Sequence, residues 1–237
     1  MIVQPHAFAN IRSVRGPVAI DLVGGPAERY ELIYMDPPWE FENYSEKGED
    51  RNPNRWYDTM TLEQLKLLPV ADLAARNCMC SCWMTFPRLL DGLELLRHYG
   101  FRYVTVGQVW IKLNKLVGLR SIIDIARDVF MGPGYWTRAN AEILVFASKG
   151  SPKRLSKSVR QIVMHPIGAH SEKPLVFRRN LERLIDTDRR IELFCRREPE
   201  EGWDVWGNQV GALEAGTIRK RRIVAVEAPA PLLDYAA

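Results

Sequence analysis

Four consecutive residues, Asp36-Pro37-Pro38-Trp39, have the types and spacing to do chemistry, and they directly follow an apolar run at 30–35. Two prolines remove two backbone donors and stiffen the turn, which predicts that the Pro37 carbonyl points outward as a free acceptor. A carboxylate and a carbonyl side by side suit an exocyclic amino group, because each of its two N–H bonds can be accepted. The Trp39 ring could stack on the flat face of a base. The alternative interpretation is a rigid acidic turn beside a core tryptophan.

The segments around this turn predict alternating strands and helices. Short runs rich in β-branched or aromatic residues predict strands, and leucines at helical spacing behind caps or prolines predict helices. This alternation favours one α/β domain, over residues 1–210, with a mostly parallel sheet. In such sheets ligands bind beyond the carboxyl ends of the strands, where Asp36 is expected to lie. The expected strands are 18–23, 30–35, 78–85, 103–111, 141–147 and 190–195, and the expected helices are 61–76 with an interruption at Pro69, 87–100 and 174–185.

Length and composition exclude several classes of protein. The chain has 237 residues with 46% hydrophobic and 26% charged residues, which excludes a disordered chain or a coiled coil. The longest stretches without a charged residue span 11 positions, as at 77–87, and a membrane-spanning helix needs about 20 apolar residues. Together with an N-terminus unlike a signal peptide, this predicts a cytoplasmic protein. Residues 211–237 contain a basic cluster at 219–222 and alternating Ala and Pro, which predicts a peripheral tail.

Four cysteines are too few and too clustered for a disulfide framework. Cys78, Cys80 and Cys82 alternate along one expected strand, so they share one face and are interpreted as small apolar core residues. A metal site is the alternative, but this spacing is unlike that of zinc ligands and the four histidines lie elsewhere in the sequence. We therefore expect no metal.

An ordered series of motifs resembles the MT-A70 family of S-adenosylmethionine-dependent N6-adenine methyltransferases. The resemblance runs from about Tyr30 to Gln209, and the compact chain is more similar to bacterial and phage members than to the larger eukaryotic subunits. It implies a Rossmann-like methyltransferase with helices on both faces of the sheet, the catalytic motif ahead of the cofactor strand, and S-adenosyl-L-methionine as cofactor. The motifs are Asp36–Trp39, Arg55–Met60, Gly134–Trp136, His170–Pro174, Ile191–Arg196 and Trp203–Gln209.

The resemblance also implies roles for single residues on the substrate side. The catalytic group is Asp36, Pro37, Pro38 and Trp39. Tyr57 matches an aromatic residue in a loop that closes on the adenine. Glu142 matches an acidic position near the target base in some members, with a structural Glu at a strand start as the alternative. Lys173 matches a lysine of the substrate loop that also lies on the cofactor side.

The resemblance implies that the cofactor is bound by Asp36 and Lys173, together with residues at and beyond the end of the last expected strand. Phe194 and Arg196 would border the cofactor, and Asn208 with Gln209 would bind its ribose. Asp21, at the end of the first expected strand, would accept a hydrogen bond from its adenine ring. The chain departs from the larger members at Cys195 and at 197–199, where Arg-Glu-Pro stands in place of a His-Asn pair.

The segment 149–160 carries five basic residues and no acidic one, so it is a candidate to neutralise phosphates beside the substrate loop. A solvated surface loop is the alternative interpretation. The preferred partner is DNA, because the chain resembles the short microbial members and lacks added RNA-binding modules. RNA adenosine methylation, N4-cytosine methylation and a non-catalytic nucleic-acid-binding subunit are the alternatives, and the sequence leaves both monomer and homodimer open.

Overall fold

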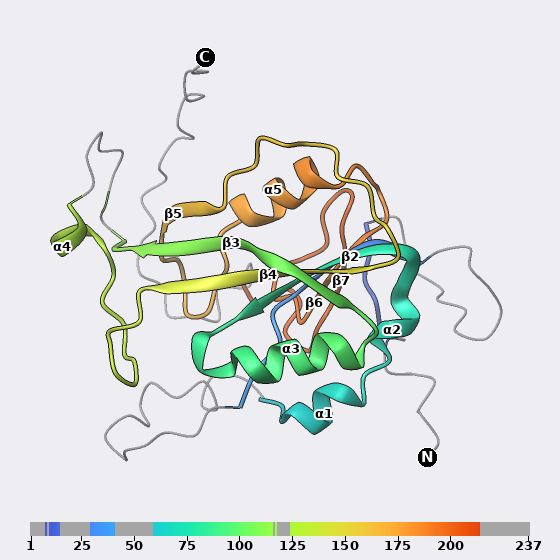
Figure 1. Ribbon diagram of the computed structural model, residues 1–237, viewed down its shortest axis with the longest axis horizontal. Coiled ribbons are helices and arrows are strands. Elements are labelled where there is room, and N and C mark those ends of the chain that lie inside the picture. The colour runs from blue at the N-terminus through green and yellow to red at the C-terminus, as the bar shows by residue number, and fades with distance from the viewer. Residues whose placement is uncertain are drawn as a thin grey trace.

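The computed structural model of the chain describes residues 8, 10–14, 29–40, 59–115, 117 and 124–213. These form one curled sheet with helices against it (Figure 1). Short connections join most of the elements. In chain order the elements are β1 (Tyr30–Met35), α1 (Leu62–Lys66), α2 (Val70–Leu73), β2 (Ala74–Met84), a 3-10 turn η3 (Phe86–Arg88), α3 (Leu89–His98), β3 (Arg102–Leu113), α4 (Ile125–Asp128), β4 (Ala141–Lys149), β5 (Ile162–Pro166), α5 (Val176–Leu184), β6 (Arg190–Leu193) and β7 (Asp204–Trp206).

The sheet has seven strands in the order β5-β3-β4-β2-β1-β6-β7. The pairs β1 with β2, β1 with β6, β6 with β7 and β3 with β5 are parallel, and β4 runs antiparallel to both of its neighbours. Six strands therefore end at the same edge of the sheet, which we call the carboxyl edge, and only β4 among the described strands ends at the opposite edge. The predicted mostly parallel α/β sheet is confirmed.

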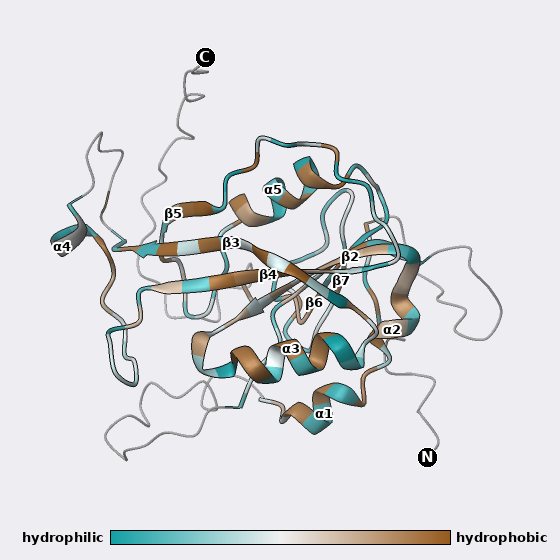
Figure 2. Ribbon diagram, in the orientation of Figure 1, coloured by the Kyte–Doolittle hydropathy of each residue, from teal (hydrophilic) through white to brown (hydrophobic). Residues whose placement is uncertain are grey.

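Helices cover both faces of this sheet, as predicted. On one face α1, α2 and α3 bury leucines against Ile33 and Met35 of β1, and on the other face α5 buries Phe177 and Leu181 against Leu32. Figure 1 shows α1 and α3 on the side of the sheet away from α5. Apolar and polar residues alternate around α3 and α5 in Figure 2, so each helix turns one apolar face toward the sheet. From Leu32 to Met35, the odd and even residues of β1 thus belong to two separate cores.

Local signals in the sequence set several element boundaries. Thr61 caps α1 and forms a capping box with Gln64, and Pro69 separates α1 from α2, as expected. Gly100 ends the α3 segment with φ +81, a conformation that glycine adopts without strain. The second part of the 61–76 helix is shorter than predicted, because the chain enters β2 already at Ala74, where it pairs with Tyr30.

Two strands were not expected from the sequence. β5 lies at one end of the sheet and leaves Ile162 and Met164 exposed, so it lacks the apolar pattern of a buried strand. β7 has only three residues and lies at the other end, beside β6. The expected strand at 18–23 and most of the expected tail lie outside the described residues. The boundary of that tail at 211 stays a prediction.

The cysteine prediction is confirmed. Cys78, Cys80 and Cys82 have no exposed surface and belong to the core that faces α3, and Cys195 is buried and free as well. Burial raises the pKa of each thiol, that of Cys78 to about 12, so these groups stay neutral. Within the described part of the chain there is no group of three or more His, Cys, Asp and Glu side chains arranged to hold a metal ion. No helix there is long and apolar enough to cross a bilayer.

Candidate active site

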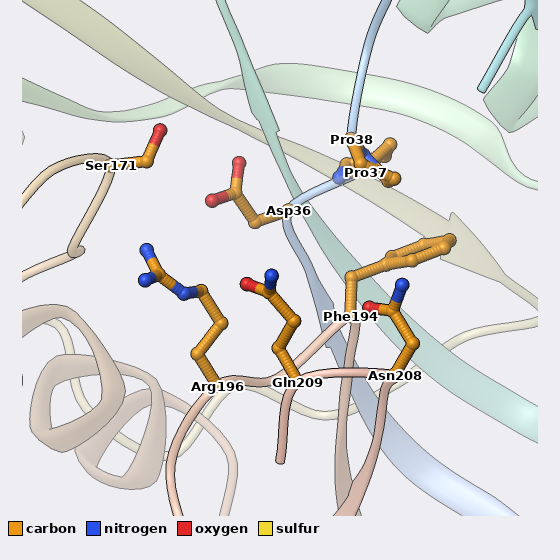
Figure 3. Close-up of a pocket in the computed structure, with 8 residues that line it drawn as sticks. All are labelled: Asp36, Pro37, Pro38, Ser171, Phe194, Arg196, Asn208 and Gln209. Carbon is orange, nitrogen blue, oxygen red and sulfur yellow. The ribbon is translucent and has the colours of Figure 1, made fainter. Parts of the chain in front are cut away.

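A pocket at the carboxyl edge brings together segments that are far apart in the sequence. Met35 at the end of β1 pairs with Leu193 at the end of β6, so the residues after these strands are neighbours. Figure 3 shows their side chains converging with those that follow β7 and precede α5. Since β2 and β6 flank β1 on its two sides, this is a switch point at which open α/β sheets bind ligands. The pocket is lined by Asp36, Pro37, Pro38, Ser171, Phe194, Arg196, Asn208 and Gln209.

Backbone strain is concentrated at this pocket. Among the described residues, Phe194 and Ser171 are the two non-glycine residues with positive φ, at 61° and 57°, and both line it. Such conformations cost about 1–3 kcal/mol and persist only where the surroundings hold them. Gly207 packs closely against the backbone of the turn that carries Phe194. A Cβ at Gly207 would lie 2.5 Å from the Cys195 carbonyl oxygen and 3.1 Å from the Phe194 carbonyl carbon. The turn after β6 therefore has a fixed shape that requires glycine at 207.

Four charged side chains form a chain of ion pairs beside the pocket. Lys173 Nζ donates to Asp36 Oδ2 at 2.7 Å and lies 3.3 Å from Glu142 Oε2. The other oxygen of Glu142, Oε1, accepts from Lys112 Nζ. The Lys173 ammonium also lies 5.4 Å from the centre of the Trp83 ring, within the range of a cation–π contact. Asp36, Glu142 and Lys173 are thus brought together as the resemblance implied, and Lys112 is an addition.

Burial and these charges act in opposite directions on the two carboxyl groups. Burial raises the pKa of Asp36 above its usual value, and the neighbouring Lys173 only partly opposes this. Burial also acts to raise the pKa of Glu142, but Lys173 and Lys112 outweigh it and lower the pKa. Glu142 is therefore the fixed negative charge of the chain, whereas Asp36 is the group whose protonation is poised to change.

Two expectations for the Asp-Pro-Pro-Trp turn are corrected by the structure. The Pro37 carbonyl is not free, because the Trp39 N–H donates to it at 2.9 Å, although a carbonyl oxygen has a second lone pair. The Trp39 side chain is 5% exposed, belongs to the core that faces α3, and is not among the residues that line the pocket. The stacking of this ring on a base conflicts with that burial. The Pro38 carbonyl accepts from Met60 N at 2.8 Å, which ties the turn to the segment before α1.

The residues expected to hold the cofactor lie together. Phe194, Arg196, Asn208 and Gln209 share the pocket with Asp36. Arg196 Nη1 donates to the His170 carbonyl at 2.7 Å, which joins the turn after β6 to the loop before α5. Burial lowers the pKa of His170, with Arg196 and Lys173 adding to the effect, so its ring is neutral at neutral pH.

The site also contains residues that sequence reasoning missed. Ser171 lies inside a recognised motif but was not singled out, and its positive φ could not be read from the sequence. Lys112 lies one residue beyond an expected strand end, and the rule that ligands gather at carboxyl ends could have marked it. Arg197, at one of the departures from the larger family members, donates to Glu172 Oε1 and so ties down the loop before α5.

Three further expectations concern residues that the structure does not place at this pocket. Tyr57 and Asp21 lie outside the described residues, so their roles stay predictions. The basic segment 149–160 does not begin beside the substrate loop, because β4 is antiparallel and ends at the opposite edge. There Lys149 pairs with Cys78 near the start of β2, and Leu155 N donates to the carbonyl of Leu184, the last residue of α5. The first part of this segment therefore follows the edge of the sheet opposite Asp36.

The donor set of the pocket fits S-adenosylmethionine. Asn208 and Gln209 offer amide groups suited to ribose hydroxyls, Asp36 offers an acceptor, and Arg196 offers positive charge for a carboxylate. Lys173 lies beside the pocket, where it holds Asp36. The Gly207 backbone lies close to Cys195. The two turns that carry Phe194 and the amides of Asn208 and Gln209 therefore lie against each other and line the same side of the pocket. Phosphate-binding glycine loops are absent from the sequence, in agreement with a cofactor that has no phosphate.

Comparison with known proteins agrees with this arrangement. The model of the family described as MT-A70 matches residues 30–209. The type II methyltransferase M.MunI of a Mycoplasma species is 28% identical over 202 residues, which cover 78% of this chain and 79% of that protein. A putative N(6)-adenosine-methyltransferase MT-A70-like protein of Medicago truncatula is 26% identical over 86% of this chain and 29% of its own length. The human N(6)-adenosine-methyltransferase catalytic subunit METTL3 is 25% identical over 78% of this chain and 29% of its own length. Since the family model spans well over half of the chain and residues from four of the motifs meet in one pocket, the chain belongs to the MT-A70 family of Rossmann-like methyltransferases.

Proposed function

We propose that this protein transfers a methyl group from S-adenosylmethionine to the exocyclic N6 amine of adenine in nucleic acid, with DNA as the preferred substrate. The observation that carries the proposal is that Asp36, with its two prolines, lines the same pocket as Phe194, Arg196, Asn208 and Gln209. The acceptor groups for an amine and the groups suited to the cofactor therefore face one shared space.

The reaction needs alignment more than charge. When bound, the cofactor supplies an electrophilic methyl group on a sulfonium. Attack by a neutral amine spreads positive charge rather than creating it, so most of the rate gain comes from orientation. Asp36 accepts one N–H of the amine and holds its nitrogen toward the donor, and the second lone pair of the Pro37 carbonyl is available for the other N–H. Hydrogen bonds placed in this way are worth roughly a hundredfold or more in rate.

The ion pairs beside Asp36 position this carboxylate. Lys173 holds Oδ2 at 2.7 Å, which leaves Oδ1 for the substrate amine. Glu142 and Lys112 fix Lys173 in turn, and the side chains of Lys173, Glu142 and Lys112 are 12%, 16% and 18% exposed. A largely buried chain of this kind keeps its geometry without help from water. The proton of the amine is lost to solvent during or after transfer.

DNA is preferred over RNA because of how the chain compares with its relatives. The alignment covers 79% of the type II methyltransferase M.MunI but only 29% of the Medicago and human adenosine methyltransferases. The present chain therefore matches most of M.MunI but only a minor part of the Medicago and human proteins. RNA adenosine methylation by the same pocket is the second candidate, favoured by the adenosine named in those relatives.

The test is a transfer assay with the full chain. The protein is incubated with S-adenosylmethionine labelled in its methyl group and with matched double-stranded DNA, single-stranded DNA and RNA, and each product is digested to nucleosides. We expect label in N6-methyldeoxyadenosine, and at least roughly a hundredfold less of it with Asp36→Ala. Label in N4-methylcytosine, or none with any substrate although calorimetry shows that the cofactor binds, would refute the proposal, and label only in N6-methyladenosine would reverse the preference for DNA.

A further inference from the structure

A short hairpin at the carboxyl edge carries the Gly-Tyr-Trp motif, which the proposed function does not use. The hairpin occupies residues 129–140, between α4 and β4. Its base is tied to the end of β3, where Phe130 N donates to the Lys112 carbonyl at 2.8 Å. Gly132 N donates to the Ala139 carbonyl at 2.9 Å across the two arms. The arms therefore project from the strand end that carries Lys112 of the ion-pair chain.

The tip of this hairpin is a tight turn that needs glycine. A Cβ at Gly134 would lie 2.1 Å from the Thr137 carbonyl oxygen and 3.0 Å from Ala139 N. Both neighbours are backbone atoms, so no side-chain movement would make room. The turn thus holds the two intervening residues, Tyr135 and Trp136, at the end of the projection.

The side chains at this tip are the most exposed aromatic group of the described protein. Trp136 is 100% exposed, Tyr135 is 56% exposed and nearby Met131 is 69% exposed. Trp83 and Trp203, by contrast, are each 1% exposed. A fully exposed indole forgoes the burial that makes tryptophan favourable in a folded chain, so its presence at a built projection indicates a surface that is covered in use.

The hairpin leads directly into the ion-pair chain. Glu142 is the second residue of β4 and lies six positions after Trp136, which limits the span to about 20 Å. Glu142 contacts Lys173, which holds Asp36. The tip therefore lies within the reach of a nucleic acid whose adenine occupies the pocket. The bases next to that adenine in the strand would lie only a few stacking steps from it, near the tip.

Charge favours a nucleic acid over a second copy of the chain as the occupant. Residues 129–140 contain Arg138 and no carboxylate, and exposed Lys115 follows the end of β3. This balance suits a phosphate backbone around a stacking aromatic. Three side chains at a hairpin tip also fall short of the roughly 800 Å² per partner that a stable protein–protein interface buries.

We propose that Trp136, flanked by Tyr135 and Met131, inserts into the base stack of the nucleic acid beside the adenine that enters the pocket. This inference rests on the proposed function, because a base that leaves its stack leaves a gap that a flat ring can fill. Inserted apolar side chains fill such gaps in other nucleic-acid complexes. The hairpin then stabilises the substrate with its target base outside the helix.

The test compares fluorescein-labelled 24-base-pair duplexes that differ only in a central abasic site. We expect the protein to bind the abasic duplex about fivefold or more tighter than the intact one, as one stacking contact would give. Trp136→Ala should remove this preference and raise KM for methyl transfer by a similar factor, while Trp136→Phe retains part of both. The matched control is Leu155→Ala, which truncates a side chain that is 63% exposed at the opposite edge and should change neither.

Each other outcome has a meaning. If Trp136→Ala keeps the abasic preference and KM, or if the wild-type protein shows no preference on DNA and on matched RNA duplexes, the insertion is refuted while the proposed methyl transfer stands. If Trp136→Ala converts a dimer to a monomer in light scattering and leaves the abasic preference intact, the tip is a contact between copies, which also refutes it. If the wild type transfers no methyl group to DNA or RNA, the proposed function fails and this inference fails with it.

Discussion

The two edges of the sheet differ in how their charges are arranged. At the carboxyl edge, acids and bases alternate in a chain from Asp36 through Lys173 and Glu142 to Lys112. At the opposite edge, a second pocket is lined by four cations with a single carboxylate, that of Glu31, which pairs with Arg189. The residues lining that pocket are Arg29, Glu31, Ala74, Ala75, Arg76, Asn77, Lys149 and Arg189.

Backbone conformation separates the two edges as well. The non-glycine residues with positive φ, Ser171 and Phe194, lie at the carboxyl edge, and among the described residues no others occur. Glycines with positive φ occur at both edges, as at Gly100 and Gly150 at the opposite edge and Gly211 at the carboxyl edge. Among the described residues, only the carboxyl edge holds non-glycine residues in this conformation, which indicates that packing maintains strain there for a ligand. Charge alone does not distinguish a site here, because the opposite edge is the more basic one.

The largest effect is expected from the acceptor carboxylate. Asp36→Ala should lower kcat by roughly a hundredfold or more, because the amine loses the group that orients it. Glu31→Ala, at the opposite edge, should change kcat by less than about twofold, since surface ion pairs contribute little. Both constants are measured by methyl transfer at saturating cofactor, and equal losses in the two variants would remove the functional distinction between the edges.

The thermal stability of an Asp36 variant distinguishes a loss of catalysis from a loss of folding. Burial raises the pKa of Asp36, so the folded state favours the protonated carboxyl. The resulting stability is present below the pKa of the unfolded chain and is lost as the pH rises through the pKa of the folded state. Asp36→Asn keeps a neutral group at every pH, so its Tm at pH 7 should equal or exceed that of the wild type and the difference should shrink in acid. A lower Tm at pH 7 would contradict this.

The next largest effect concerns Lys173. Lys173→Met removes the cation that opposes the rise in the pKa of Asp36, so this pKa should increase further. Since the ionised carboxylate is the acceptor, activity falls as the pH drops through that pKa, and the acidic limb of the pH profile should move to higher pH. At neutral pH we expect kcat/KM to fall by roughly tenfold, in line with a charge-assisted hydrogen bond. Lys149→Met at the opposite edge should leave the profile in place, and an identical shift there would point to a general effect of net charge.

A smaller effect is expected from a pair of glycines, one at each edge. Gly207→Ala places a methyl group against the Cys195 backbone, so the turn that carries Phe194 must move. The Kd for S-adenosylmethionine, measured by calorimetry, should rise by about fivefold or more, since such overpacking costs ~1–3 kcal/mol. Gly100→Ala meets no atom within 4 Å and only strains the positive φ. It should lower stability by about 1 kcal/mol and leave Kd unchanged; a similar Kd in both variants would remove the role given to Gly207.

The smallest effect is expected from the basic segment. Lys153→Gln combined with Arg154→Gln should change KM for a short single-stranded oligonucleotide by less than about twofold at fixed salt. The reason is position, because these residues follow the end of β4 at the opposite edge, about 20 Å from Asp36 along β1. A several-fold rise in KM would show that the opposite edge holds phosphates, and the substrate would then extend across the sheet.

Local patterns in the sequence were sufficient for much of the fold. Alternation along 78–85 identified a buried strand, the Thr61–Gln64 box set the start of α1, and the placement of Asp36 after an apolar run located the carboxyl edge. These features depend on residues two to four positions apart, whose side chains meet in any strand or helix of that sequence. Trp39 shows the limit of such reasoning, because the sequence favoured a stacking surface for its ring, whereas the structure buries the ring in the core.

The amino-acid sequence by itself determined most of the strands and helices, the cysteine face and the motif series that marks the family. Only the tertiary structure decided that the residues after β1 and β6 share a pocket, that Lys173 holds Asp36 from 137 positions away, that Lys112 joins them, and that Trp39 is buried while Trp136 is exposed. Strand register and the burial of a single ring depend on hydrogen bonds and packing between segments distant in the chain, and no local period encodes which segments become neighbours.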